Sequence, residues 1–366
     1  MSVFILTYIF SSFFAYLYSV EKDKYIASLL KICLFTSLFL PLALRYDIGT
    51  DYVNYAQQIT YDVNPVENKW GGFEFGWRPL LWLIKTFEID VHYFFVIIAF
   101  FSVLLVLNIV EKKYAYFAIV IYVSTLYLDS FSLVRQAFAG LIAFYGIASY
   151  YKKDNKRYLI FVFAACLFHS SMYFFLVLLP VFLFMENVQP FSKKKIIFLF
   201  SFIYVFFTVI NIPKIVFSVI VNSVFSSMSR YFTDELYGSA TKLGTGLGVL
   251  LKEFTAFPFI FFITYCNKRK QTNKFFMQAL IIHFLIIITY IFSTQITILN
   301  RLPYIFTPYF LISINFLGNS KSKYRKIILI LVVIIFTTNF IVNLIKNPSA
   351  SPGGLGITPY QSIFSR

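Results

Sequence analysis

Long apolar stretches separated by short charged clusters run through almost the whole chain. A helix that crosses the hydrocarbon core of a bilayer needs roughly 20 mostly apolar residues. Read this way, the pattern predicts about 12 membrane-spanning helices, with a range of about 10–13. Their approximate segments are 2–20, 26–44, 91–110, 114–129, 133–151, 157–169, 171–186, 194–212, 246–266, 275–293, 302–318 and 327–345.

Two parts of this pattern are less regular. The segments 157–169 and 171–186 are short, so they form either two spans or one re-entrant pair. The apolar segment 79–90 is too short and too charged to span, and we expect an interfacial or re-entrant helix there.

Composition supports a membrane protein. Of the 366 residues, 59% are hydrophobic and only 13% are charged, too few to solvate the surface of a globular protein of this size. We therefore predict an all-α, polytopic integral membrane protein with a single transmembrane domain over 1–366. The three cysteines each lie in a separate apolar run, which excludes a disulfide framework and a metal-ligand spacing.

The formal charge of +16 is explained by topology. Lysine-rich clusters fall in alternate, short connections: 22–24, 112–113, 152–157, 193–195, 268–274 and 321–326. The positive-inside rule places these connections in the cytoplasm and both termini outside. The outer face then carries the long segments 45–90 and 213–245, and nucleic acid is not an expected partner.

Arginines concentrate on the predicted outer face. Arg45, Arg135 and Arg301 each lie at the outer end of a predicted span, where the phosphate of a lipid-linked substrate would lie. The planar guanidinium grips phosphate or carboxylate better than lysine does. These arginines are thus candidates for anion binding; alternatively, they reach toward lipid headgroups or pair with outer acidic residues.

Carboxylates and aromatic rings follow the second predicted span. If the chain continues helically there, Asp47 and Asp51 share one face with Tyr55. Carboxylates beside aromatic rings suit a sugar, although the acids could simply neutralise arginines. His169, in Phe168-His169-Ser170-Ser171, could act as a general base, donate to a phosphate, or only hydrogen-bond between helices. Without a nucleotide-binding motif, energy would come from an activated substrate already in the membrane, unless the protein performs no chemistry at all.

Five short motifs occur in a distinctive order. They are Arg45-x-x-x-Gly49-x-Asp51-Tyr52-x-x-Tyr55, Glu74-Phe75-Gly76, Ser132-x-x-Arg135-Gln136-x-Phe138-Ala139, Phe168-His169-Ser170-Ser171 and Asn300-Arg301-Leu302-x-Tyr304, followed by the tail Ile357-Thr358-Pro359-Tyr360. In this order the sequence resembles the EpsG family of polysaccharide-unit polymerases, which is related to the O-antigen polymerases called Wzy. One departure is Trp77-Arg78, where a more apolar continuation is expected.

The resemblance implies a membrane glycosyltransferase with a GT-C-like architecture that needs no metal and no cofactor. It would move a growing glycan from undecaprenyl diphosphate to a new lipid-linked repeat unit, on the outer face of the cytoplasmic (inner) membrane, in lipopolysaccharide or exopolysaccharide synthesis. A diphosphate leaving group needs positive charge, and the acceptor hydroxyl needs a base. The predicted catalytic residues are Arg135, Arg301, His169, Asp51 and Glu74, and the predicted substrate-binding residues are Arg45, Arg78, Tyr52, Tyr55, Arg230 and Tyr304.

The expected partners are an undecaprenyl diphosphate-linked oligosaccharide, the lipid bilayer and a chain-length regulator protein. Three alternatives stay open from the sequence: an O-antigen ligase that moves finished glycan to another acceptor, a non-enzymatic flippase for the lipid-linked oligosaccharide, and a structural subunit. A flippase would favour polar residues through both leaflets, whereas ionisable residues here crowd the outer ends of the spans.

Overall fold

The computed structural model describes residues 1–185, 191–209, 247–266, 275–295, 299, 301–346 and 355–365. These residues are mostly helical. Five of the described helices are long and apolar enough to cross a membrane: α1 (Ser2–Val20), α2 (Lys24–Ala43), α5 (His92–Ile109), α16 (Phe275–Gln295) and α19 (Arg325–Lys346). The chain is an all-α membrane protein, as the hydropathy pattern predicts, while the number of spans and the GT-C-like architecture stay predictions.

Most of the remaining helices coincide with predicted spans, and α7, with 18 residues, is as long as α5. They are α6 (Ala115–Tyr122), which continues into the π-helix η4 (Val123–Tyr127), α7 (Val134–Tyr151), α8 (Asn155–Phe168), α9 (Tyr173–Met185), α10 (Lys193–Val209), α14 (Leu247–Phe254), α15 (Phe257–Cys266), α17 (Pro303–Phe306) and α18 (Tyr309–Asn319).

Two predicted spans are interrupted. The segment 246–266 divides into α14 and α15 around Thr255 and Ala256, and 302–318 divides into α17 and α18 around Thr307 and Pro308. A proline lies at or just after each interruption, Pro258 in the first turn of α15 and Pro308 directly before α18. Because proline lacks an N–H donor and suits the start of a helix, it favours a new helix over a continuous one.

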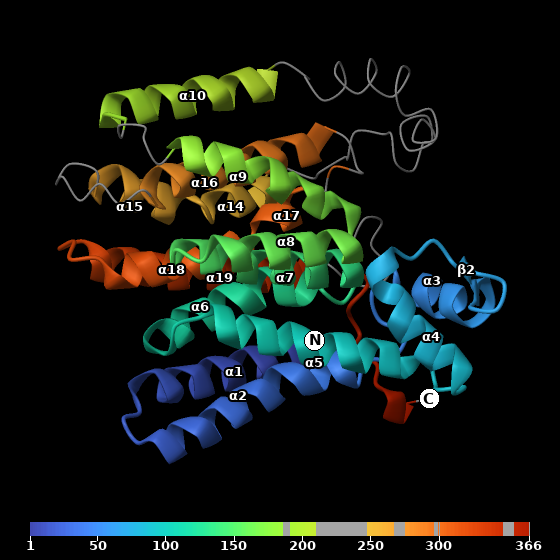
Figure 1. The fold of residues 1–366 in the computed structure, drawn as a ribbon. Coiled ribbons are helices and arrows are strands. Elements are labelled where there is room, and N and C mark those ends of the chain that lie inside the picture. The colour runs from blue at the N-terminus through green and yellow to red at the C-terminus, as the bar shows by residue number, and fades with distance from the viewer. Residues whose placement is uncertain are drawn as a thin grey trace, which may run out of the picture. The chain divides into compact units, whose positions relative to one another are not determined.

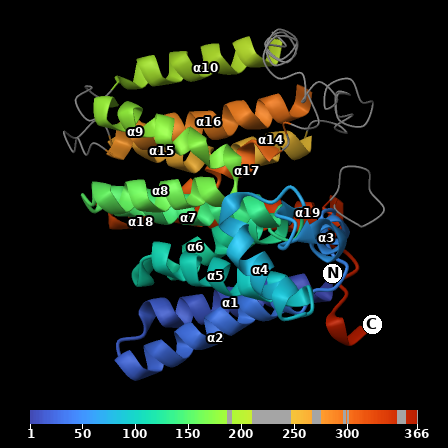
Figure 2. The same ribbon diagram turned by 45° about the vertical axis from the view of Figure 1, so that its right-hand side comes forward.

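The helices cluster into two compact units. Unit 1 comprises Met1–Leu178, Phe310–Asn319 and Phe336–Arg366, and unit 2 comprises Leu179–Tyr309 and Ser320–Ile335. Within unit 1, α1 packs against α2 and α6, and α7 packs along α8. Figures 1 and 2 show these helices running side by side. Their core is strongly aromatic, with Phe94, Phe95, Tyr122, Tyr127 and Phe131 all buried.

One end of unit 1 gathers connections that the charge pattern assigns to the cytoplasm. Lys112 Nζ donates to the Glu21 carbonyl at 2.8 Å, which joins the α1–α2 connection to the one after α5. Asn319, at the end of α18, joins the same group by accepting from Tyr114 Oη at 2.8 Å and donating to Glu111 at 3.1 Å. The α1–α2 connection, the connection after α5 and the end of α18 therefore meet, as a common membrane side requires.

The opposite end carries the segment 45–90, which Figure 1 shows gathered beside the ends of the helices. Its elements are α3 (Tyr52–Gln57), the π-helix η1 (Gln58–Asp62), the antiparallel strands β1 (Val63–Asn64) and β2 (Lys69–Trp70), the 3-10 turn η2 (Phe75–Trp77) and α4 (Arg78–Thr86). The short helix expected over 79–90 is thus α4. The C-terminal residues 355–365 lie against the start of this segment, where Ile363 N donates to the Leu44 carbonyl at 3.0 Å.

Candidate functional site

An ion pair lies where the segment 45–90 meets α7. Arg135, in the first turn of α7, donates through Nη1 to Glu74 Oε2 at 2.9 Å and to the Gly72 carbonyl at 3.3 Å. The two side chains are 20% and 25% exposed, so the pair is half-buried yet reachable from solvent. The macrodipole disfavours a cation at a helix N-terminus, and Glu74 offsets that cost.

Aromatic rings enclose the Arg135 guanidinium. Its Cζ lies 5.1 Å from the centre of the Tyr55 ring and 4.9 Å from that of Phe73. Asp51, at the start of α3, also acts on this cation electrostatically. Cation–π contacts at this distance stabilise the guanidinium while leaving its edges free for hydrogen bonding. Four predicted site residues, Arg135, Glu74, Tyr55 and Asp51, are therefore brought together.

Glu74 is held by the turn that follows it. The ideal Cβ of an alanine at Gly76 would lie 2.8 Å from the Leu167 carbonyl oxygen, so only glycine allows η2 to approach the end of α8 so closely. The next residue, Trp77, is buried, and its indole Nε1 donates to the Phe168 carbonyl at 2.8 Å. The departure from the expected motif at Trp77 is thus an anchor that fixes Glu74 beside α7.

His169 directly follows Phe168, the residue at the end of α8 whose carbonyl accepts the hydrogen bond from Trp77. It caps η5 (Ser170–Met172): its Nδ1 accepts the Ser171 N–H at 3.2 Å and lies 2.7 Å from the Ser171 hydroxyl. Because Nδ1 accepts a backbone N–H, the neutral ring carries its proton on Nε2. The local geometry thus favours His169 as a donor through Nε2 over the general-base alternative.

Arg45 has a different environment. Its side chain is buried, and Nη1 donates to the carbonyls of Ser130 and Phe131 at 3.2 and 3.1 Å. The rings of Phe95 and Phe131 cover its Cζ at 4.8 and 5.3 Å. Burial lowers the pKa of Arg45 to about 10, so the guanidinium stays charged at neutral pH. This position favours a structural role for Arg45 over the direct substrate contact suggested by the sequence.

The turn after Arg45 packs against the start of α7 and the C-terminal residues. Gly49 has φ +95°, and an alanine Cβ there would lie 2.1 Å from the Phe131 carbonyl oxygen. Ser132 Oγ accepts from Thr50 N at 3.2 Å and donates to the Leu355 carbonyl at 2.6 Å. Glycine and serine in the motifs therefore serve close backbone packing here.

Two further predicted residues flank the ion pair. Tyr52 is buried, with its ring stacked on Phe95 at 4.4 Å. Arg78, directly after η2, is half-buried, and its Cζ lies 5.6 Å from the Trp70 ring and 5.4 Å from the Phe75 ring. Tyr52 therefore belongs to the packing beneath the site, whereas Arg78 lies on the same loop as Glu74.

Comparison with known proteins places this geometry in context. The model of the EpsG family matches residues 28–362, nearly the whole chain. The chain belongs to the EpsG family. The resemblance found in the motifs is thus confirmed, and the family is one of Wzy-like polymerases. No curated protein and no solved structure matches the chain.

Other predicted residues of this EpsG-family chain do not belong to the described part of unit 1. Arg301 and Tyr304 belong to unit 2, where Arg301 is exposed and Tyr304 is part of α17. Arg230, and the predicted loop 213–245 that carries it, lie outside the described residues. The roles of these residues stay predictions.

Sequence reasoning about this EpsG-family chain missed two side chains of the site. Phe73 packs on Arg135, yet it reads as an ordinary apolar residue in a loop. Trp77 anchors the turn, whereas the sequence marks it only as a departure from the motif. A signal for Phe73 was its position directly before Glu74. The described residues contain no group of three or more His, Cys, Asp or Glu that could hold a metal ion, and metal independence stays a prediction.

Proposed function

We propose that this EpsG-family chain polymerises lipid-linked oligosaccharide repeat units. It would transfer a growing glycan from undecaprenyl diphosphate to a new lipid-linked repeat unit on the outer face of the cytoplasmic membrane. The observation that carries the proposal is the reachable Arg135–Glu74 pair, which forms where the segment 45–90 meets the N-terminus of α7.

Arg135 is suited to the leaving group. When the bond between the anomeric carbon and the diphosphate breaks, its electron pair passes to a phosphate oxygen, and negative charge grows there. A guanidinium has five N–H donors, and the hydrogen bonds to Gly72 and Glu74 both come from Nη1. The N-terminus of α7 adds positive potential at the same point. Arg135 would therefore stabilise the departing diphosphate.

Glu74 is suited to the acceptor. A hydroxyl of the incoming repeat unit attacks the anomeric carbon, and its proton has to pass to a base. Glu74, the ion-pair partner of Arg135, would accept that proton. Asp51, which also acts electrostatically on Arg135, is a second candidate. Direct displacement of this kind inverts the anomeric centre.

His169 and the remaining arginines would bind the diphosphate or glycan. With Nδ1 occupied by Ser171, His169 would donate through Nε2 to a phosphate or sugar oxygen. Arg78 would add charge from the loop that carries Glu74, and Arg301 and Arg230 would contribute from their own segments. A chain-length regulator protein in the same membrane would set how many units are joined.

Deletion of the gene in a host that assembles its surface glycan from lipid-linked units tests the proposal. Gel analysis of the surface glycan is expected to show the ladder collapsing to the core or carrier with one repeat unit, and the wild-type gene should restore the ladder. Loss of all repeat units would point to a ligase or flippase instead. An unchanged ladder would refute the polymerase.

A further inference from the structure

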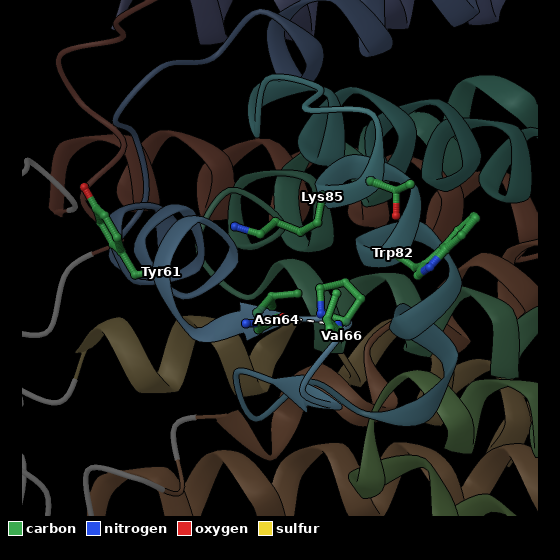
Figure 3. Close-up of a pocket in the computed structure, with 8 residues that line it drawn as sticks. Tyr61, Asn64, Val66, Trp82 and Lys85 are labelled. Atoms are coloured by element: carbon green, nitrogen blue, oxygen red, sulfur yellow. Dashed lines mark hydrogen bonds between the residues drawn. The ribbon is translucent and has the colours of Figure 1, made fainter.

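The segment 45–90 also contains a pocket that neither Arg135 nor Glu74 lines. It is a cavity of about 600 Å³, of the size that small-molecule sites have. Its walls include Tyr61, Asn64, Trp82, Lys85 and Thr86. In Figure 3, Trp82 and Tyr61 lie on opposite sides of the view, with Lys85 and Asn64 between them.

The lining combines exposed aromatic faces with hydrogen-bonding groups. Trp82 is 47% exposed and Tyr61 is 79% exposed, although burial of large aromatic side chains is strongly favourable. Between them lie an amide, a hydroxyl and an ammonium group, from Asn64, Thr86 and Lys85. A sugar has matching features, with apolar ring faces for the aromatics and hydroxyls for the polar groups. An acyl chain would match only the aromatics.

The pocket is held in shape without a ligand. Lys85 Nζ donates to the Thr60 carbonyl at 2.7 Å, which ties α4 to η1 and uses one of the three ammonium donors. Asn64 Oδ1 accepts from Val66 N at 3.1 Å and Glu67 N at 3.3 Å, which fixes the turn between β1 and β2. A preformed site loses less entropy when it binds a ligand.

The pocket and the ion pair share their supporting elements. The helical run that presents Tyr55 to Arg135 continues through the π-helix η1 to Tyr61, six positions further along the chain. The turn that presents Glu74 leads directly into α4, which carries Trp82 and Lys85. A chain of sugars with one end at the ion pair could therefore extend along these two elements to the pocket.

We propose that the pocket formed by Tyr61, Asn64, Trp82 and Lys85 is a subsite for a sugar residue of the lipid-linked glycan, next to the residue that reacts. This proposal rests on the proposed polymerase function. It adds a second place at which the protein would bind the glycan, away from Arg135 and Glu74. This subsite would hold the substrate while Arg135 and Glu74 act on the glycosidic bond.

Binding of free glycan to the full-length protein in lipid nanodiscs tests the subsite. The probe is the reducing repeat-unit oligosaccharide released by mild acid from the host's own lipid-linked intermediates. Trp82→Ala is expected to raise Kd about tenfold, and Tyr61→Ala about threefold. Two control variants, Leu83→Ala and Tyr93→Ala, alter side chains that are 42% and 55% exposed but do not line the pocket, and they should bind like the wild type.

Equal glycan binding by Trp82→Ala and Leu83→Ala would overturn the subsite. A second measurement addresses a membrane anchor: brominated phospholipids in the nanodisc would quench the fluorescence that Trp82→Phe removes. Strong quenching that glycan leaves unchanged would mean that Trp82 lies in lipid, which also overturns the proposal. Protection from quenching by glycan would support it.

The binding assay separates this proposal from the polymerase itself because it needs no turnover. Arg135→Ala should keep the glycan affinity of the wild type while it loses polymerisation. In cells, Trp82→Ala should shift the ladder to shorter chains rather than stop at one unit. If gene deletion leaves the ladder intact but Trp82→Ala still loses binding, the polymerase fails and the sugar site stands.

Discussion

Arg45 and Arg135 look alike in the sequence and differ in the structure. Each follows or begins a helix at the same end of unit 1, and aromatic rings cover each guanidinium. Arg45 is only 2% exposed and donates to backbone carbonyls, whereas the Arg135 side chain is 20% exposed and pairs with a carboxylate. An arginine at the end of a span can therefore be part of the protein's packing. The exposed fraction of its side chain and the identity of its hydrogen-bond partner distinguish it from an arginine that a substrate can reach.

Arg135→Ala should give the largest effect on activity. Loss of a group that stabilises the leaving diphosphate is expected to lower polymerisation at least about 100-fold, with membrane abundance unchanged. Gel analysis of surface glycan against immunoblots of membranes measures both. The matched control is Arg157→Ala, because Arg157 also lies in a first helical turn and pairs with an acid, Asp154 at 3.1 Å. Full-length glycan in the Arg135 variant would end the leaving-group hypothesis.

A charge exchange sharpens this result. Arg135→Glu combined with Glu74→Arg could restore the ion pair but would place a carboxylate where the diphosphate departs. We expect normal abundance and no polymerisation. Recovery of the ladder in the double variant would mean that the pair only holds the loop against α7.

Arg45→Met should act on stability first. The variant leaves the carbonyls of Ser130 and Phe131 without their donor, at a cost of about 2–4 kcal/mol. Membrane abundance and the apparent Tm in detergent should fall, while polymerisation per folded molecule stays within about threefold of wild type. A stable Arg45→Met protein that makes only single repeat units would place Arg45 in direct contact with substrate.

Ser132→Ala should give the smallest effect. It removes the hydroxyl that joins Thr50 to Leu355, worth about 1–2 kcal/mol for two hydrogen bonds, without touching either guanidinium. A modest drop in apparent Tm with an unchanged ladder is expected. Loss of the ladder at normal abundance would show that this junction also positions the reacting groups.

Hydropathy predicted the positions of many helices, because a helix that crosses a membrane is recognised by its length and its apolar composition. The predicted segments 2–20 and 91–110 agree with α1 and α5 within one residue at each end. The interruptions at Ala256 and Pro308 were not predicted, although Pro258 and Pro308 stand in the sequence, because an apolar run outweighs a proline in a hydropathy reading.

The site was predicted as a set of residues rather than as an arrangement. The pairing of Glu74 with Arg135 joins positions far apart in the chain, and it depends on the close approach that Gly76 allows. Nothing local distinguishes the burial of Arg45 from the exposure of Arg135, since both stand beside apolar and polar residues. The cavity beside Trp82 depends on a hairpin and a lysine contact that only the folded loop provides.

The contact between residues 355–363 and the Arg45 turn also bears on biosynthesis. Tyr46 donates to the Gln361 carbonyl, and Gly49 donates to the Gly356 carbonyl. These backbone hydrogen bonds join a segment that is synthesised early to one that is synthesised late. Once residues 1–169 have been synthesised, Arg135, Glu74 and His169 are all part of the nascent chain. At that point residues 355–363, which contact the turn after Arg45, have not yet been made. Until residues 355–363 have been synthesised, the turn after Arg45 therefore lacks these hydrogen-bond partners.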